Sequence, residues 1–203
     1  MTLESITIPA EKPQGLIVAL HGWGANANDL ASLAAYLKLS NYQLIFPEAP
    51  FPHPNVVNGK AWYDLRAENM YQGLLESREM LRDWLLSLAE TTGIPLSKTM
   101  LIGFSQGGAM TLDVGLKLPL AGLVAMSGYL HPDAIPPTKQ DFPQILIMHG
   151  TSDRVVPIQA AQRIKLALES VGAALEYEEF NAEHEINPEM LERLRNFVVQ
   201  VIP

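Results

Sequence analysis

Short apolar runs alternate with longer amphipathic stretches along this chain. The runs are five or six residues long and partly β-branched, which is typical of strands that are buried on both faces of a sheet. The segment from Thr2 to Ile8 alternates polar and apolar residues more strictly, which indicates an edge strand with one wet face. The predicted buried strands are Gly15 to Leu20, Tyr42 to Phe46, Thr99 to Phe104, Ala121 to Met126, Gln144 to Met148 and Leu175 to Phe180.

Helical patterns occupy the intervals between these runs. Regular alternation of strand and helix predicts an α/β fold: a mostly parallel sheet of about seven strands with helices on both faces. In such a sheet, ligands bind at the carboxyl ends of the strands. A chain of 203 residues is most simply one domain, spanning residues 1–203. The predicted helices are Asn28 to Leu39, Tyr71 to Thr92, Gln106 to Leu118, Ile158 to Val171 and Pro188 to Val201.

Composition and charge narrow the classes of partner. The chain has no cysteine, which excludes disulfides, thiolate metal sites and a cysteine nucleophile. Its 22 acidic residues outnumber 14 basic ones and give a formal net charge of -8, so nucleic acid is not an expected partner. The first residues lack a signal-peptide pattern, and no apolar stretch reaches the roughly 18 residues of a membrane span. We therefore expect a cytoplasmic protein without stable membrane insertion.

A Gly-x-Ser-x-Gly pattern lies between a predicted strand and a predicted helix. The segment from Gly103 to Gly108 reads Gly-Phe-Ser-Gln-Gly-Gly. In a nucleophile elbow of this kind the turn strains the serine backbone, and the flanking glycines avoid clashes that a Cβ atom would cause. Ser105 is therefore a candidate nucleophile. The alternative is a glycine-rich turn that contains an incidental serine.

A nucleophilic serine needs a base within hydrogen-bond reach and an acid that orients the base. In an α/β-hydrolase sheet these residues occur in the chain order serine, acid, histidine, with the acid after a later strand. Asp153 and His184 fit that order. Taken singly, each has a structural alternative: a helix cap for Asp153 and a surface residue for His184. Asp133 and Asp141 also precede His184, but they lie in a proline-rich loop before the predicted strand from Gln144 to Met148.

The tetrahedral intermediate of acyl transfer also needs two backbone N–H donors for its oxyanion. An elbow supplies one donor from the residue after the nucleophile, which here is Gln106. The second is expected from the loop after an earlier strand, where Leu20 to Gly24 reads Leu-His-Gly-Trp-Gly. Gly22 and Gly24 allow the backbone to turn its amides inward. The N–H of Trp23 is therefore the candidate second donor.

Five short motifs thus follow one another along the chain: Leu20 to Gly24, Trp62 to Asp64, Gly103 to Gly108, His149 to Pro157, and His184. Together they resemble the phospholipase/carboxylesterase family, which includes the acyl-protein thioesterases. The similarity runs from about residue 16 to about residue 197 with consistent spacing.

This resemblance implies an α/β-hydrolase fold and a serine esterase or thioesterase that acts on a small-molecule acyl ester. It implies no cofactor, and no metal site is predicted. It assigns the triad to Ser105, Asp153 and His184, in agreement with the residue-based assignment, and it assigns the oxyanion amides to Trp23 and Gln106. Some relatives form dimers, and the sequence leaves open whether this chain forms a homodimer.

Two departures from the family pattern bear on the substrate. The segment Leu65 to Leu75 looks shorter than in acyl-protein thioesterases, where this region helps shape the acyl channel. Glu185 follows His184, where a small or polar residue is common. We therefore expect short- to medium-chain acyl esters rather than long acyl chains on proteins. Substrate contacts are expected from Trp62, Met70, Tyr71 and Val155, and loop pinning is an equally strong alternative for Trp62.

Other functions stay open at this point. An acyl-protein thioesterase or a lysophospholipase would use the same triad, because the nucleophile and oxyanion steps are shared. From a different class, the chain could be a non-catalytic ligand-binding homologue of hydrolases. Such a protein would not need an intact serine, acid and base, and all three are present here.

Overall fold

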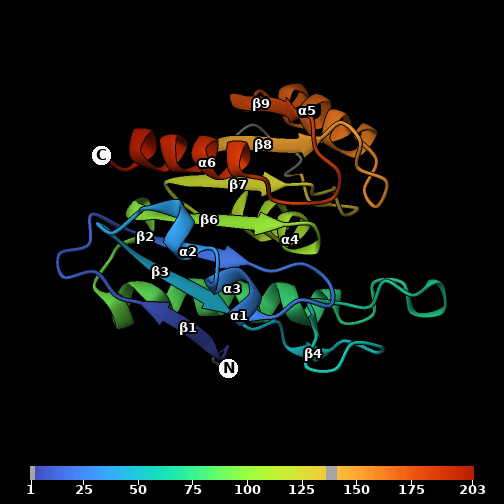
Figure 1. The fold of residues 1–203 in the computed structure, drawn as a ribbon, viewed down its shortest axis with the longest axis horizontal. Helices are drawn as coiled ribbons and strands as arrows, with labels where there is room; N and C mark the ends of the chain where they lie inside the picture. Colours follow the sequence, from blue (N-terminus) through green and yellow to red (C-terminus); the bar gives the residue numbers. More distant parts are fainter. Residues whose placement is uncertain (1–2, 136–140) are drawn as a thin grey trace.

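The computed structural model describes residues 3–135 and 141–203 and is built around a seven-stranded sheet (Figure 1). All neighbouring strands in this sheet are parallel except the first pair, in which β1 is antiparallel to β3. The predicted parallel sheet of about seven strands is therefore confirmed. In spatial order the strands are β1 (Ser5–Ile8), β3 (Tyr42–Pro47), β2 (Gly15–Leu20), β6 (Thr99–Phe104), β7 (Gly122–Met126), β8 (Gln144–Gly150) and β9 (Leu175–Phe180).

Helices cover both faces of this sheet, as the alternating pattern predicts (Figure 1). One face packs against α3 (Leu74–Thr92), α4 (Gln106–Gly115) and α5 (Gln159–Ser170). The opposite face packs against α1 (Ala27–Ala31), α2 (Ala34–Leu37) and α6 (Pro188–Val201).

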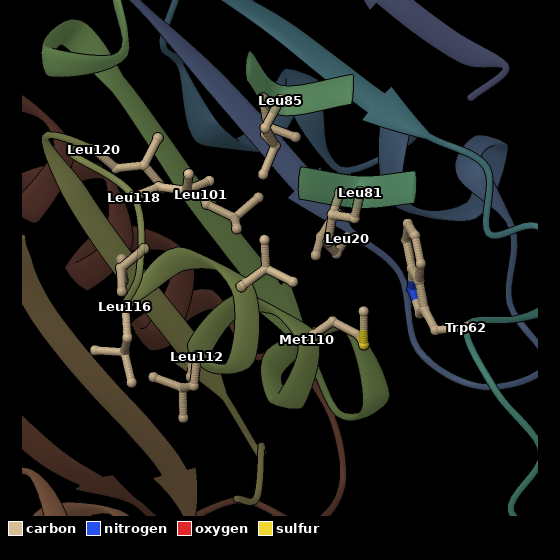
Figure 2. Close-up of a cluster of buried hydrophobic side chains, with 14 of the residues drawn as sticks. Leu20, Trp62, Leu81, Leu85, Leu101, Met110, Leu112, Leu116, Leu118 and Leu120 are labelled. Atoms are coloured by element: carbon tan, nitrogen blue, oxygen red, sulfur yellow. The ribbon is translucent and has the colours of Figure 1, made fainter. Parts of the chain in front are cut away.

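The central strand β2 shows how one strand serves two cores. Successive side chains of a strand point to opposite faces of its sheet. Val18 and Leu20 join the core beneath α3 and α4, whereas Ile17 and Ala19 join the core beneath α6. Figure 2 shows the first of these cores, where Leu20 lies near Leu81 of α3. A strand that is apolar at every position is therefore needed at the centre of the sheet.

The predicted helix from Asn28 to Leu39 is wrong as one continuous element. A capping box, in which Asn26 and Asp29 exchange side-chain and backbone hydrogen bonds, starts α1 one residue earlier than expected. The chain then turns, α2 forms a single turn, and Lys38 ends it in the left-handed region at a φ of 53°. No glycine or proline marks this break, so the sequence pattern does not reveal it.

The proline-rich stretch from residue 47 to residue 65 has no helix, as predicted, but it contains a small antiparallel hairpin of β4 (Phe51–Pro52) and β5 (Lys60–Ala61). The segment after it closes on itself: the N–H of Asp64 donates to Gln72 O at 3.0 Å, and that of Tyr71 donates to Asp64 O at 2.9 Å. Two short 3₁₀ turns, η1 (Ala67–Asn69) and η2 (Leu96–Lys98), complete the elements.

Two sequence predictions fall partly outside the described residues. These are Thr2, at the start of the predicted edge strand, and residues 136–140 of the second proline-rich loop. Within the ranges that the structure describes, no helix is long and apolar enough to cross a membrane.

Candidate active site

The carboxyl ends of the parallel strands gather the predicted site residues at one edge of the sheet. Trp23 follows β2, Ser105 follows β6, Asp153 follows β8 and His184 follows β9. The pairing of β2 with β6, in which Leu20 lies beside Gly103, brings the first two of these loops together. Four segments that are far apart in the sequence therefore meet where ligands bind in such sheets.

Ser105 sits in a strained turn between β6 and α4. Its φ of 55° and ψ of -117° lie in a region that residues with a Cβ atom rarely adopt. The flanking glycines are required by close contact. A Cβ atom on Gly103 would lie 2.2 Å from Gly107 O, and one on Gly107 would lie 2.2 Å from Leu20 O. The sequence interpretation of the Gly-x-Ser-x-Gly pattern therefore agrees with the geometry of the turn.

A continuous hydrogen-bond chain joins the three predicted triad residues. His184 Nε2 lies 3.0 Å from Ser105 Oγ, and His184 Nδ1 lies 2.7 Å from Asp153 Oδ2. The imidazole also packs on Phe104, with ring centroids 4.8 Å apart. Since the carboxylate can only accept, Nδ1 carries the proton in the neutral ring and Nε2 faces the serine with its lone pair. This is the tautomer that a general base requires.

The carboxylate of Asp153 is held in a fixed orientation and stays ionised. Its Oδ1 accepts the N–H groups of Val155 at 2.9 Å and Val156 at 2.8 Å, which leaves Oδ2 for His184. Burial opposes ionisation, but the hydrogen bonds from His184 and these two amides outweigh it and lower the pKa of Asp153. His149 lies behind the carboxylate and bonds to Val156 O at 2.7 Å. The acid is thus pre-oriented toward the imidazole.

The two predicted oxyanion amides both lack a protein partner among residues 3–135 and 141–203. Neither the N–H of Trp23 nor that of Gln106 bonds to another group there. Gln106 is the first residue of α4, so its amide also lies at the positive end of a helix dipole. Gly22 approaches the nucleophile closely, since a Cβ atom placed on it would lie 3.4 Å from Ser105 Cβ. Free N–H groups in this place can donate hydrogen bonds to a developing oxyanion.

Trp62, a predicted substrate contact, is a packing residue. Its side chain is fully buried, and its indole N–H donates to His21 O at 3.0 Å. Figure 2 shows it within the apolar core near Leu20 and Leu81. The alternative, that this aromatic residue pins its loop, is the one that the structure supports.

The other three predicted contact residues occupy different environments. Tyr71 is partly buried and packs against Tyr63 and His131, with ring centroids 5.7 and 5.6 Å apart. Met70 and Val155 are exposed, at 49% and 68% of their surface. None of the three lines either of the cavities that flank the Gly22 to Trp23 turn.

Those two cavities differ in chemistry. One of about 240 Å³ lies against His184; most of its wall is apolar, formed by Leu30, Leu33, Phe104 and Ile186, and Asp29 and Glu185 also line it. The other, of about 310 Å³, lies against Trp23, with a wall that includes Asp64, Arg66 and Glu76. The Arg66 guanidinium beside Asp64 lowers the pKa of that carboxyl to about 2, so the second cavity carries fixed charges.

Sequence reasoning misses the apolar wall of the first cavity. Phe104 lies next to the nucleophile in the sequence and Ile186 lies two residues after the base, so their positions could have identified them. Leu30 and Leu33 lie in the region that the sequence pattern predicts as one ordinary helix. Leu33 lies at the break between α1 and α2, for which the sequence offers no signal.

Comparison with known proteins finds related sequences along nearly all of the chain. The sequence profile of the Phospholipase/Carboxylesterase family matches residues 1–202. "Acyl-protein thioesterase 1" of Schizosaccharomyces pombe is 31% identical over 172 residues, covering 76% of each chain. "Acyl-protein thioesterase 1 homolog 2" of Dictyostelium discoideum is 29% identical over 209 residues, covering 93% of this chain and 90% of its own.

A solved structure gives the same result for the fold. The crystal structure of esterase PE8 superposes with a TM-score of 0.87 at 28% identity, covering 99% of this chain and 100% of its own. The sheet described above is therefore that of an α/β-hydrolase, as the resemblance implied. Because the family profile spans nearly all of the sequence, this chain belongs to the phospholipase/carboxylesterase family.

Proposed function

We propose that this chain is a serine carboxylesterase that hydrolyses short- to medium-chain acyl esters through an acyl-enzyme on Ser105. The observation that carries the proposal is the unbroken chain from Asp153 through His184 to a serine in a strained elbow. A serine hydroxyl at its ordinary pKa is a poor nucleophile, and this arrangement supplies the base that activates it.

The proposed reaction has two halves. Ser105 Oγ attacks the ester carbonyl carbon while His184 Nε2 takes its proton, and the oxyanion receives the N–H groups of Trp23 and Gln106. When the intermediate collapses, the alcohol leaves with the proton from His184 and the acyl group stays on Ser105. Water then attacks the acyl-enzyme with the same base and returns the free serine and the acid. Asp153 stabilises the imidazolium that forms in each half.

The size of the mostly apolar cavity beside His184 supports short acyl groups. Pockets for drug-sized ligands typically measure about 300–1,000 Å³, and the cavity beside His184, at about 240 Å³, lies below that range. Better turnover of a palmitoyl ester than of a butyryl ester would contradict this part of the proposal.

The test of the reaction uses a short-chain aryl ester and a fluorophosphonate probe. We expect Ser105→Ala to abolish both turnover and covalent labelling while the far-UV circular dichroism spectrum stays unchanged. Ser127→Ala is the matched control, because Ser127 is also a strand-end serine with positive φ, at 48°, and is fully buried. An active Ser105→Ala variant would overturn the assignment, and a wild-type chain that neither turns over ester nor reacts with the probe would favour the non-catalytic alternative.

The relatives named acyl-protein thioesterases give the second candidate function. A thioester would pass through the same acyl-enzyme, so the triad does not separate the two activities. Rates on matched oxygen esters and thioesters of increasing acyl length would separate them. We expect oxygen esters of short acids to be turned over at least as fast as the thioesters.

A further inference from the structure

A second hydrogen-bond chain, outside the triad, runs through the core between α4 and the loop after β5. Asp113 of α4 lies 2.6 Å from His131 Nδ1, and His131 Nε2 lies 2.6 Å from the hydroxyl of Tyr63. That hydroxyl also bonds to the hydroxyl of Tyr129. Asp113 and Tyr63 are fully buried, and His131 is 3% exposed. We call Asp113, His131 and Tyr63 the buried relay.

The chemistry of Asp113 fixes the direction of this relay. Burial opposes its ionisation, but the hydrogen bonds from His131 and Arg78 prevail and lower its pKa. Because the carboxylate only accepts, Nδ1 of His131 donates to it, and in the neutral ring Nε2 accepts from Tyr63. Burial raises the pKa of Tyr63 well above its ordinary value, so the phenol keeps the proton that it donates. The relay therefore holds Tyr63 in one orientation.

The backbone of Tyr63 and its neighbour Trp62 holds the nucleophile elbow. The side chain of Gln106 spans this dipeptide: its Oε1 accepts the N–H of Trp62 at 3.0 Å, and its Nε2 donates to Tyr63 O at 2.8 Å. Gln106 is the residue whose own N–H is the first oxyanion donor of the proposed mechanism. Its side-chain position thus depends on where the dipeptide lies.

The same dipeptide holds the loop that carries the other oxyanion donor. The indole of Trp62 donates to His21 O at 3.0 Å, two residues before Trp23. The hydroxyl of Ser77 in α3 donates to Trp62 O and adds a further hydrogen bond to the dipeptide. β5, which precedes the dipeptide, is only two residues long, so sheet pairing alone does not fix it. Side-chain bonds must supply the remaining restraint.

We propose that the buried relay positions the oxyanion hole: by holding Tyr63, it fixes the dipeptide that orients the loops of both donor amides. This proposal rests on the proposed esterase function and adds Tyr63 and His131 to it as positioning residues. Misplacing a reacting group by 1 Å can lower a rate by about 100-fold, so a small shift of both amides is enough to be measured.

The test removes the Tyr63 hydroxyl, and with it the hydrogen bonds to His131 and to Tyr129. Tyr63→Phe keeps the ring and its packing but loses the hydroxyl that bonds to His131. We expect kcat on an aryl ester to fall about 10-fold with KM within about two-fold, because the oxyanion contact is made in the transition state. Affinity for a trifluoromethyl ketone, which forms the same oxyanion when it adds to the serine, is expected to fall by a similar factor.

Tyr42→Phe is the matched control. Tyr42 is also buried, at 4% exposure, and its hydroxyl donates to Ile202 O at 2.5 Å on the opposite face of the sheet, far from the oxyanion loops. We expect it to lower the melting temperature without changing kcat or the ketone affinity. An equal loss of kcat in both variants would mean that lost stability alone is responsible, which would overturn the proposal.

A second variant, His131→Asn, keeps a side-chain N–H that can face Asp113 but has no atom in the place of Nε2. We expect it to lose kcat as Tyr63→Phe does, and the double variant to be no worse than the poorer single one. If Tyr63→Phe does not fold, His131→Asn decides the question by itself. Wild-type values of kcat and ketone affinity in these variants would overturn the proposal.

Failure of the proposed function has a different signature. A wild-type chain without esterase turnover, or an active Ser105→Ala variant, would overturn the esterase mechanism and this proposal together. An active wild-type enzyme that loses activity with Ser105→Ala but keeps it with Tyr63→Phe would overturn only the positioning role.

Discussion

Two hydrogen-bond chains in this protein run from an aspartate through a histidine to a hydroxyl group, and only one of them ends where a substrate can reach it. Asp153, His184 and Ser105 follow the carboxyl ends of strands, Ser105 is partly exposed, and His184 borders a cavity. The buried relay has the same order of groups with closely similar spacing, but its phenol lies in the core against a second tyrosine. The order of chemical groups therefore does not by itself make a nucleophile.

The two hydrogen-bond chains also differ in the charged groups that surround their aspartates, Asp113 and Asp153. Asp113 is paired with Arg78 at 2.6 Å and with Lys117 at 3.3 Å, so its negative charge is already compensated. Among the described residues, Asp153 has ion-pair contacts only with His149 and His184. Its charge is therefore available to stabilise the imidazolium of the proposed mechanism. The hydrogen-bond chain of Asp153 therefore suits proton transfer, and that of Asp113 suits holding Tyr63 in one position.

The strongest test of this difference replaces each aspartate with asparagine. We expect Asp153→Asn to lower kcat by about 10,000-fold, because the amide favours the wrong tautomer of His184. Asp113→Asn should lower kcat by about 10-fold or less, because its relay acts only through position. Steady-state kinetics on one aryl ester measure both. Equal losses in the two variants would contradict the division of roles.

Asp113→Asn should instead show its main effect on stability. Removing one partner of a buried charge pair costs about 3 kcal/mol or more, here because Arg78 would lose its carboxylate. The pH dependence has a definite sign. Since the pKa of Asp113 is lowered in the folded state, its contribution is present above the ordinary value of about 3.9 and is lost as pH falls through the folded-state pKa.

Urea unfolding at several pH values measures this contribution. As pH falls below about 4, the free energy of unfolding should fall more steeply for the wild type than for Asp113→Asn, because the variant lacks this titrating carboxyl. Curves of equal slope would contradict the lowered pKa of Asp113.

The sequence allows the Asp153–His184–Ser105 hydrogen-bond chain of the proposed mechanism to be predicted, but not the buried relay. Ser105 lies in a recognisable pattern, and Asp153 and His184 follow apolar runs that end at one sheet edge. Asp113 lies inside a helix with nothing unusual around it, and His131 lies in a proline-rich loop. Their contact spans 18 residues and depends on how β7 places that loop beside α4. Only the folded structure brings such residues together.

The strands show the same limit at the level of the fold. β2, β6 and β9 have the predicted bounds, because a short apolar run that ends at a turn is typical of a buried strand. The break between α1 and α2 depends instead on local hydrogen bonds, such as the hydroxyl of Ser32 donating to Asp29 O at 2.6 Å. Leu33, which lines the cavity beside His184, lies at that break, so the sequence pattern does not predict its place in the wall.

Filling the cavity beside His184 should change the acyl-length preference of the proposed ester hydrolysis and leave the buried relay unaffected. Leu33→Trp places a larger side chain against the wall beside His184. We expect kcat/KM for a hexanoyl ester to fall about 10-fold relative to an acetyl ester, which is the scale of a few methylene groups in an apolar pocket. Parallel assays of the two esters measure the ratio. Leu166→Trp, at an exposed position of α5, is the control, and an unchanged ratio in Leu33→Trp would show that the acyl group lies elsewhere.

The smallest expected effect is at the end of the buried relay. Tyr129→Phe removes a hydroxyl that bonds to Tyr63 but leaves the bond from Tyr63 to His131 in place. A lost hydrogen bond of this kind costs about 1 kcal/mol of unfolding free energy, and kcat should stay within about two-fold of the wild type. Thermal unfolding and ester hydrolysis on the same preparation measure both. A loss of kcat as large as that of Tyr63→Phe would contradict this expectation. It would mean that Tyr129 also helps to position the oxyanion hole and belongs to the relay.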